Sequence, residues 1–95
     1  MTKQEIKNII IEILKKNNVK KASLFGSFLE KDFESSNDID ILIEFLDNEK
    51  TLLDLIGLKY EIEDRLLKKI DLLTYDSINP SLSENIIKNS EKLYG

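Results

Sequence analysis

The stretch that decides the fold is residues 24–45, LFGSFLEKDFESSNDIDILIEF. It contains Gly26-Ser27, then a spacer of ten residues, then Asp38-Ile39-Asp40. One apolar run leads into the glycine and a second begins at the carboxylates, which predicts two strands joined by a turn and a polar segment. Because side chains alternate along a strand, we expect the two aspartates on one face and the isoleucine between them on the other. This stretch therefore places two carboxylates near a turn that can bind an anion.

The size and composition of the chain limit what it can be. Ninety-five residues predict one domain, residues 1–95. With 41% apolar and 34% charged residues, the chain is expected to fold as a soluble globular protein. No apolar run is long enough to cross a bilayer and the amino terminus does not resemble a signal peptide, so we expect a cytoplasmic protein without a membrane partner.

The charge balance and the missing residue types narrow the chemistry. A net charge of −4 disfavours direct binding to nucleic acid, because a protein that holds phosphates along a strand is usually basic. The chain has no cysteine and no histidine, which excludes thiolate sites and removes the commonest general base and zinc ligand. Any catalysis must use carboxylates, hydroxyls, lysines and the single arginine, Arg65.

Two long helices are predicted. Thr2 and Glu5 fit a capping box for a helix that ends at residues 17–18. A second helix is expected to begin at Thr51 with Asp54 and to continue to about residue 68, with one packed apolar stripe: Leu52, Leu55, Ile56, Ile62 and Leu66. Gly57 lies inside this helix, where we expect close packing against a neighbour, and Tyr60, Tyr75 and Tyr94 are expected to be packing residues.

Strands are predicted over residues 19–25, 38–45 and 70–75, and a short helix over 28–33. A last helix is expected from about residue 79 to the end of the chain, including Leu93 and Tyr94. The element order α-β-α-β-α-β-α indicates an α/β (α+β) fold, a small sheet covered by helices.

A third acid, Asp71, strengthens the prediction that Asp38 and Asp40 belong to a metal site. Asp71 lies between Ile70 and Leu72 in the third strand, where an unpaired charge would cost several kcal/mol if buried. If the second and third strands are neighbours, Asp71 can join Asp38 and Asp40. Three carboxylates this close raise one another's pKa values, and divalent cations would offset their repulsion. An all-oxygen ligand set favours Mg²⁺, with Mn²⁺ as an alternative, over zinc.

Two such ions would hold the phosphates of a nucleoside triphosphate and bring an acceptor hydroxyl to the α-phosphorus for in-line displacement. In this scheme Asp38 and Asp40 bind both ions. Asp71 binds the catalytic ion and takes the proton of the acceptor. Gly26 and Ser27 hold the β- and γ-phosphates at a helix amino terminus.

These residues resemble the nucleotidyltransferase superfamily that includes DNA polymerase β. The shared pattern is Gly26-Ser27, ten residues, Asp38-x-Asp40 and a later strand aspartate, Asp71. The segments TLLDLIGLKYEIEDRLLKKIDLLTYDSI and SLSENIIKNSEKLYG are similar to the helix-strand segment and closing helix of its minimal (MNT) branch. The resemblance covers nearly the whole chain and implies a small mixed three-stranded sheet with helices mainly on one side.

The resemblance also implies a partner. Stand-alone MNT proteins are commonly antitoxins paired with a helical HEPN ribonuclease toxin, and several transfer AMP from ATP to a tyrosine of that toxin. Relatives that modify small molecules are larger because they carry an acceptor-binding domain, which favours a protein acceptor here. Self-association is compatible with the sequence.

Three positions depart from the family pattern. Glu30 stands where many relatives have Arg, Lys31 where Gly is frequent, and Asn37 where Ser often precedes the carboxylates. An acid near triphosphate oxygens would weaken nucleotide binding unless Lys31 compensates. This keeps a second hypothesis open, an antitoxin that neutralises its toxin by contact alone. A nucleic-acid polymerase is a third and weaker hypothesis, because the chain is acidic and lacks a template-binding domain.

Overall fold

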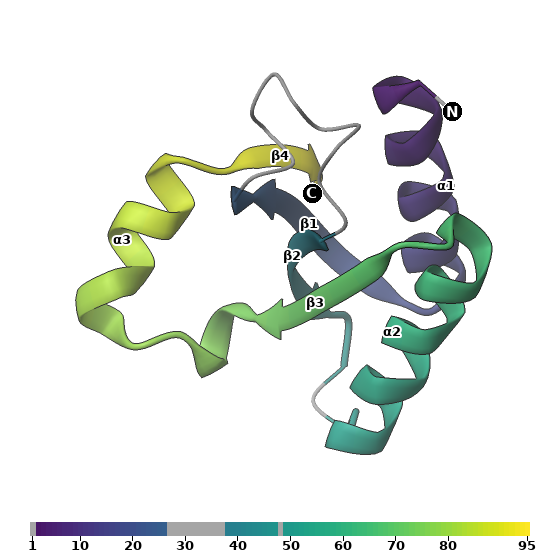
Figure 1. Cartoon of the computed structure of the whole chain (residues 1–95). Coiled ribbons are helices and arrows are strands. Elements are labelled where there is room, and N and C mark those ends of the chain that lie inside the picture. Colours follow the sequence, from purple (N-terminus) through teal and green to yellow (C-terminus); the bar gives the residue numbers. More distant parts are fainter. Residues whose placement is uncertain (1, 27–37, 48) are drawn as a thin grey trace.

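The computed structural model describes residues 2–26, 38–47 and 49–95 and places a four-stranded sheet at the centre of the molecule (Figure 1). The predicted short helix over 28–33 lies outside the described residues. The described elements, in chain order, are α1 (Lys3–Lys16), β1 (Val19–Phe25), β2 (Asp38–Phe45), α2 (Leu52–Leu66), β3 (Lys69–Thr74), the 3₁₀ turn η2 (Tyr75–Ser77), α3 (Pro80–Lys88) and β4 (Glu91–Tyr94).

The sheet is mixed, with the strand order β3-β2-β1-β4. β1 pairs antiparallel with β2 and with β4, whereas β2 and β3 run parallel. A parallel pair needs a crossover connection, and α2 supplies it between β2 and β3. β3 and β4 are therefore the edge strands of the described sheet.

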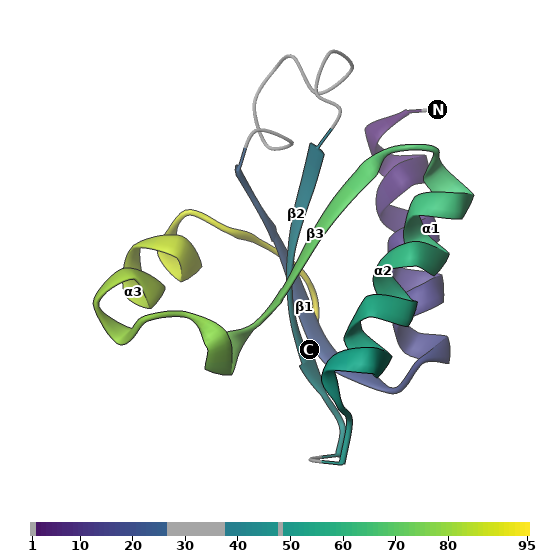
Figure 2. The same cartoon turned by 60° about the horizontal axis from the view of Figure 1, so that its bottom comes forward.

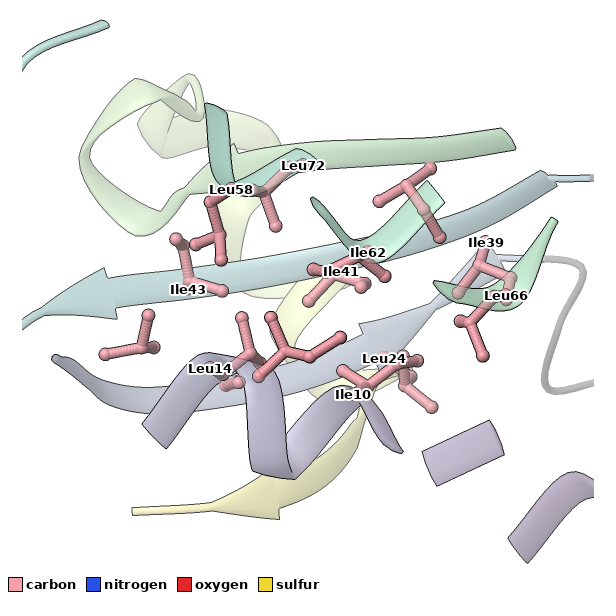
Figure 3. Close-up of a cluster of buried hydrophobic side chains, with 14 of the residues drawn as sticks. Ile10, Leu14, Leu24, Ile39, Ile41, Ile43, Leu58, Ile62, Leu66 and Leu72 are labelled. Atoms are coloured by element: carbon pink, nitrogen blue, oxygen red, sulfur yellow. The ribbon is translucent and has the colours of Figure 1, made fainter. Parts of the chain in front are cut away.

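The face of the sheet that α1 and α2 cover holds the hydrophobic core, whereas α3 lies on the opposite side (Figure 2). Ile39, Ile41 and Ile43 of β2 are fully buried there, as predicted from the alternation of the strand. Figure 3 shows them between the side chains of the two helices. The rest of this cluster consists of Ile6, Ile10, Ile13, Leu14, Val19, Ala22, Leu24, Leu58, Ile62, Leu66, Ile70 and Leu72.

Both long helices begin where their capping residues predicted. The Thr2 side chain accepts a hydrogen bond from the Glu5 backbone N–H, the Glu5 carboxylate accepts one from the Thr2 N–H, and Thr51 and Asp54 repeat this arrangement at α2. α1 ends at its C-cap Asn17, as expected. Each cap satisfies backbone donors that the first helical turn leaves unpaired.

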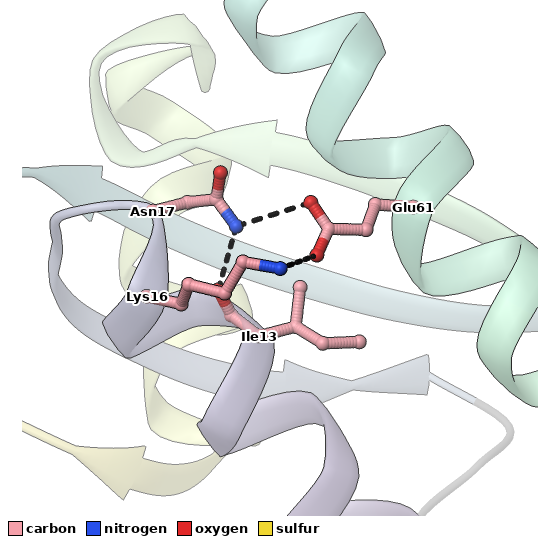
Figure 4. A network of polar contacts seen from close by, with 4 residues as sticks. All are labelled: Ile13, Lys16, Asn17 and Glu61. Atoms are coloured by element: carbon pink, nitrogen blue, oxygen red, sulfur yellow. Dashed lines mark hydrogen bonds and ion pairs between the residues drawn. The ribbon is translucent and has the colours of Figure 1, made fainter.

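The carboxyl end of α1 is joined to α2 by polar contacts with Glu61 (Figure 4). Lys16 Nζ lies 3.0 Å from Glu61 Oε2, and the Asn17 side-chain amide donates to Glu61 Oε1 at 3.3 Å and to the Ile13 carbonyl at 2.8 Å. The contacts orient two helices that are otherwise joined by apolar packing.

The packed face of α2 differs from the predicted stripe. Leu58, Ile62 and Leu66 are the buried residues of this helix, and Leu55 packs against the core from a half-buried position. Leu52 is 69% exposed and Ile56 is 37% exposed. The sequence prediction was wrong for Leu52 and Ile56 because the helix contains more apolar residues than one face can bury, so periodicity alone did not select the face.

Gly57 also differs from expectation. A Cβ atom added to this residue would have no heavy atom within 4 Å, so the close neighbour that we expected is absent among the described residues. A glycine in a helix interior costs about 1 kcal/mol relative to alanine, and packing within the described chain does not offset that cost.

The end of the chain forms a strand, not the end of a helix. α3 stops at Lys88 and residues 91–94 form β4 beside β1, so the sheet has four strands and not the predicted three. Leu93 and Tyr94 pack against the core, and the Tyr94 hydroxyl donates to the Val19 carbonyl at 2.7 Å. Residues 91–94 form a strand rather than continuing the helix because the strand pairs with the edge of β1, which a continued helix would leave unpaired.

Among residues 2–26, 38–47 and 49–95, no helix has the length and apolar character needed to cross a membrane. The predicted packing role is confirmed for Tyr94 and is wrong for Tyr60, which is 58% exposed. Tyr75 is half-buried; its hydroxyl lies 2.9 Å from Ser23 Oγ, and Lys21 Nζ lies 4.5 Å from its ring centre.

Candidate active site

The parallel pairing of β2 and β3 brings two of the predicted acids together. Asp40 and Asp71 are direct partners in the register, on the face of the sheet opposite the core. The two carboxyl groups are therefore neighbours across the strand pair, and Asp71 is among the causes that raise the pKa of Asp40. The local reason is the strand period, because Ile39 and Ile70 must face the core and their neighbours are then turned to the other side.

The electrostatics of the pair are those of crowded carboxylates. Burial is the largest cause that raises the pKa of Asp40, from 3.8 to about 6. The hydrogen bond and negative charge of Asp71 raise it further, and the charge of Asp38 adds a smaller effect in the same direction. At neutral pH this arrangement concentrates negative charge and favours a bound cation.

Asp38 lies on the same strand face as Asp40 but is exposed at the start of β2. Within the described part of the chain, no three acidic side chains are gathered closely enough to form a metal-binding group. The structure thus joins Asp40 and Asp71 directly and leaves Asp38 adjacent, one pleat along β2.

Gly26 sits beside Asp40, at the carboxyl end of β1. Its φ angle is +79°, a conformation that side chains rarely adopt, and a Cβ atom there would overlap Asp40 Oδ2. Gly26 therefore leaves room for the carboxylate. Ser27, Lys31, Glu30 and Asn37 lie outside the described residues.

A cleft of about 430 Å³ contains the acid pair. Because Leu72 and Leu73 alternate along β3, its lining comes from both faces of this edge strand. The other lining residues are Phe25, Gly26, Asp40, Leu52, Leu55, Ile56, Lys59 and Asp71. Sequence reasoning missed Lys59 and the apolar wall, since nothing in the local pattern of α2 indicates that residues of this helix line the same cleft as the carboxylates.

The donors fit a hard divalent cation. The described part of the site offers carboxylate oxygens, which are the ligands that Mg²⁺ prefers, and the chain has no histidine or cysteine to favour zinc. The raised pKa of Asp40 reflects burial and two neighbouring acids, a repulsion that a cation would relieve. Asp40 and Asp71 would hold the ion, and Asp38 lies on the same strand face.

A family model described as "Polymerase beta, Nucleotidyltransferase" matches residues 8–95. The chain belongs to this family. As a minimal nucleotidyltransferase, it is 49% identical over 90 residues to a protein of Methanocaldococcus jannaschii named "Putative protein adenylyltransferase", and the match covers 95% of this chain and 96% of the relative. It is 25% identical over 92 residues to the protein adenylyltransferase MntA of Thermococcus cleftensis, with 93% and 92% covered.

The fold is shared with solved nucleotidyltransferases. The structure of a Shewanella oneidensis MNT antitoxin in complex with its tri-AMPylated HEPN toxin superposes with a TM-score of 0.80 at 24% identity. The match covers 99% of this chain and 73% of that one. At this level of identity the likeness supports the nucleotidyltransferase fold and carries no residue roles.

Proposed function

We propose that this minimal nucleotidyltransferase is a cytoplasmic antitoxin that transfers AMP from ATP to a hydroxyl, most simply a tyrosine, of a cognate HEPN-type toxin. The observation that carries the proposal is the juxtaposition of Asp40 and Asp71 in a cleft, with Asp38 on the same face. The relatives that the chain resembles include proteins named adenylyltransferases, and a structure with the same fold is in complex with an AMPylated toxin.

The reaction forms a bond between the acceptor oxygen and the α-phosphorus and breaks the bond to the β-phosphate, releasing pyrophosphate. Asp71 accepts the proton of the acceptor hydroxyl, and Asp40 is held in place by its contact with Asp71 and by the clearance at Gly26. Bound Mg²⁺, in two ions, would neutralise charge on the attacking and leaving oxygens. Gly26 and Ser27 bind the β- and γ-phosphates, and Lys31 contributes a positive charge.

The open position of the acid pair supports a protein acceptor. The structure uses its helices α1 and α2 to cover the core, and the acid pair opens onto a cleft at an edge of the sheet. A small acceptor would need further walls to be oriented for in-line attack, whereas a folded partner supplies its own orientation.

Labelling of the partner from α-labelled ATP tests this function. The chain is co-expressed with the HEPN-domain protein encoded beside it, and the purified partner is analysed by mass spectrometry for added AMP. We expect Asp40→Asn and Asp71→Asn to reduce labelling by about 10³-fold or more while the fold survives. Labelling at the parent's rate by both variants would remove the carboxylate assignment.

Neutralisation by contact alone is the alternative, and Glu30 is the sequence feature that favours it. That hypothesis expects Asp38→Asn to neutralise the toxin as well as the parent does. It also expects no heat when Mg–ATP is titrated into the protein in a calorimeter. Nucleotide binding together with loss of neutralisation in Asp38→Asn would reject it.

A further inference from the structure

The amino-terminal half of α2 carries large apolar side chains that stay exposed in the described chain. Leu52 is 69%, Leu53 79%, Ile56 37% and Tyr60 58% exposed. Residues 52, 56 and 60 follow one another at four-residue intervals, and residue 53 is next to this row around the helix, so the four side chains form one stripe. We call these four residues the α2 stripe. A stripe of large apolar side chains is unusual on the surface of a protein that acts alone.

Gly57 lies at the side of the α2 stripe, between Leu53 and Tyr60 along the helix. It is exposed, and a side chain at this position would meet no other atom of the described chain. Glycine weakens a helix interior, and here neither a positive φ angle nor a close internal neighbour explains it. A notch between exposed apolar side chains is what a closely approaching partner surface requires.

Two residues of the α2 stripe reach the cleft that also contains the carboxylates. Leu52 and Ile56 line the same cleft as Asp40 and Asp71. Leu53 and Tyr60 lie beyond that cleft, so the stripe extends farther than the lining of a nucleotide pocket. Whatever covers the stripe therefore reaches the edge of the catalytic cleft.

We propose that the α2 stripe, with the notch at Gly57, is the docking surface for the acceptor protein. The inference rests on the proposed function, which requires a folded partner to present a hydroxyl at the acid pair. An apolar surface patch of the acceptor packs on Leu53, Ile56 and Tyr60 and follows the helix at Gly57. The acceptor's hydroxyl-bearing side chain then enters the cleft past Leu52.

Two opposite substitutions test the docking surface. Leu53→Glu places a charge in the buried contact, and we expect it to weaken binding of the co-expressed HEPN-domain partner by about tenfold or more. Gly57→Gln fills the notch with a better helix former, so we expect a higher midpoint of thermal unfolding and weaker binding together. Because stability and binding move in opposite directions in Gly57→Gln, loss of fold cannot account for the weaker binding.

Leu67→Glu is the matched control. It makes the same change at an 89%-exposed leucine that caps the other end of α2 and does not line the cleft. Calorimetry without ATP measures the affinity for the partner, and titration with Mg–ATP measures nucleotide binding. We expect Leu67→Glu to match the parent in both, and Leu53→Glu to keep the parent's affinity for Mg–ATP.

The outcomes separate the two proposals. A stable complex in which the parent transfers no AMP overturns the proposed function and leaves the docking surface supported if Leu53→Glu still breaks the complex. Parent-like affinity for the partner in both Leu53→Glu and Gly57→Gln overturns the docking surface. A parent that sediments as a dimer and becomes monomeric in Leu53→Glu, with unchanged partner affinity, assigns the stripe to self-association and also overturns it.

Discussion

The two faces of β2 have different roles: one packs in the hydrophobic core and the other carries acidic residues of the candidate active site. On one face Ile39, Ile41 and Ile43 are fully buried under α1 and α2. On the other, Asp40 lines the cleft at the edge of the sheet together with Asp71 of the neighbouring strand β3, and Asp38 is exposed at the start of β2. Along this single strand, residues that stabilise the fold therefore alternate with residues of the candidate active site. Substitutions one position apart should therefore damage different properties.

The largest expected effect on stability is on the core face. Ile41→Ala removes a side chain with no exposed surface at the centre of the cluster, and we expect it to lower the free energy of unfolding by about 3 kcal/mol. Urea denaturation followed by circular dichroism measures this loss. Asp40→Asn, on the adjacent position, is the contrast: it should retain or exceed the parent's stability. Comparable destabilisation by both variants would show that the two faces are not separable.

A smaller effect is expected at Gly26, on the acid face. Gly26→Ala adds a Cβ atom to a residue with φ of +79° and forces that atom against Asp40. We expect this variant to lose about 2 kcal/mol of the free energy of unfolding and also most of the transferase activity. Gly57→Ala is the matched control because its added atom has open space around it. That variant should gain up to about 1 kcal/mol. Equal stability of Gly26→Ala and Gly57→Ala would show that the close approach of Gly26 to Asp40 does not contribute to the free energy of unfolding.

The same division explains what the sequence could predict. β1 and β2 were predicted at the residues where the structure has them, because an apolar run leads into Gly26 in β1 and isoleucines alternate along β2. The starts of α1 and α2 were predictable from Thr2 and Thr51, whose capping partners lie three residues away. Features that depend only on residues of a single helix or strand can therefore be predicted from the sequence.

Features that depend on contacts between distant elements were missed. β4 forms because the edge of β1 is free, a fact about the sheet that residues 91–94 do not reveal. The α2 stripe could not be separated from the packed face, since apolar residues lie on both. The direct pairing of Asp40 with Asp71 follows from the parallel register, which the sequence suggested only on the condition that the two strands are neighbours.

The smallest expected effect is the pH dependence of stability, which arises from Asp40 on the acid face and not from the core face. The pKa of Asp40 is about 6 in the folded protein and 3.8 as an ordinary value, so the folded state binds more protons than the unfolded state between these values. Stability should therefore fall as pH rises from about 4 to about 6 and level off above. Two units are worth about 3 kcal/mol for a fully buried group. Solvent screening of this half-buried carboxyl reduces the expected change to about 1 kcal/mol.

The measurement is urea denaturation in chelator from pH 4 to pH 7, compared with Asp40→Asn, in which this slope should disappear. Subtracting the variant also removes the contribution of Asp54, whose pKa is lowered by hydrogen bonds from Thr51 and whose slope has the opposite sign. Adding Mg²⁺ at pH 7 should restore the stability lost by the parent, since the cation binds the ionised carboxylates that only the folded state brings together. No response to Mg²⁺ in the parent would contradict the metal assignment while leaving the core face untouched, because the buried isoleucines carry no charge that pH or a cation could change.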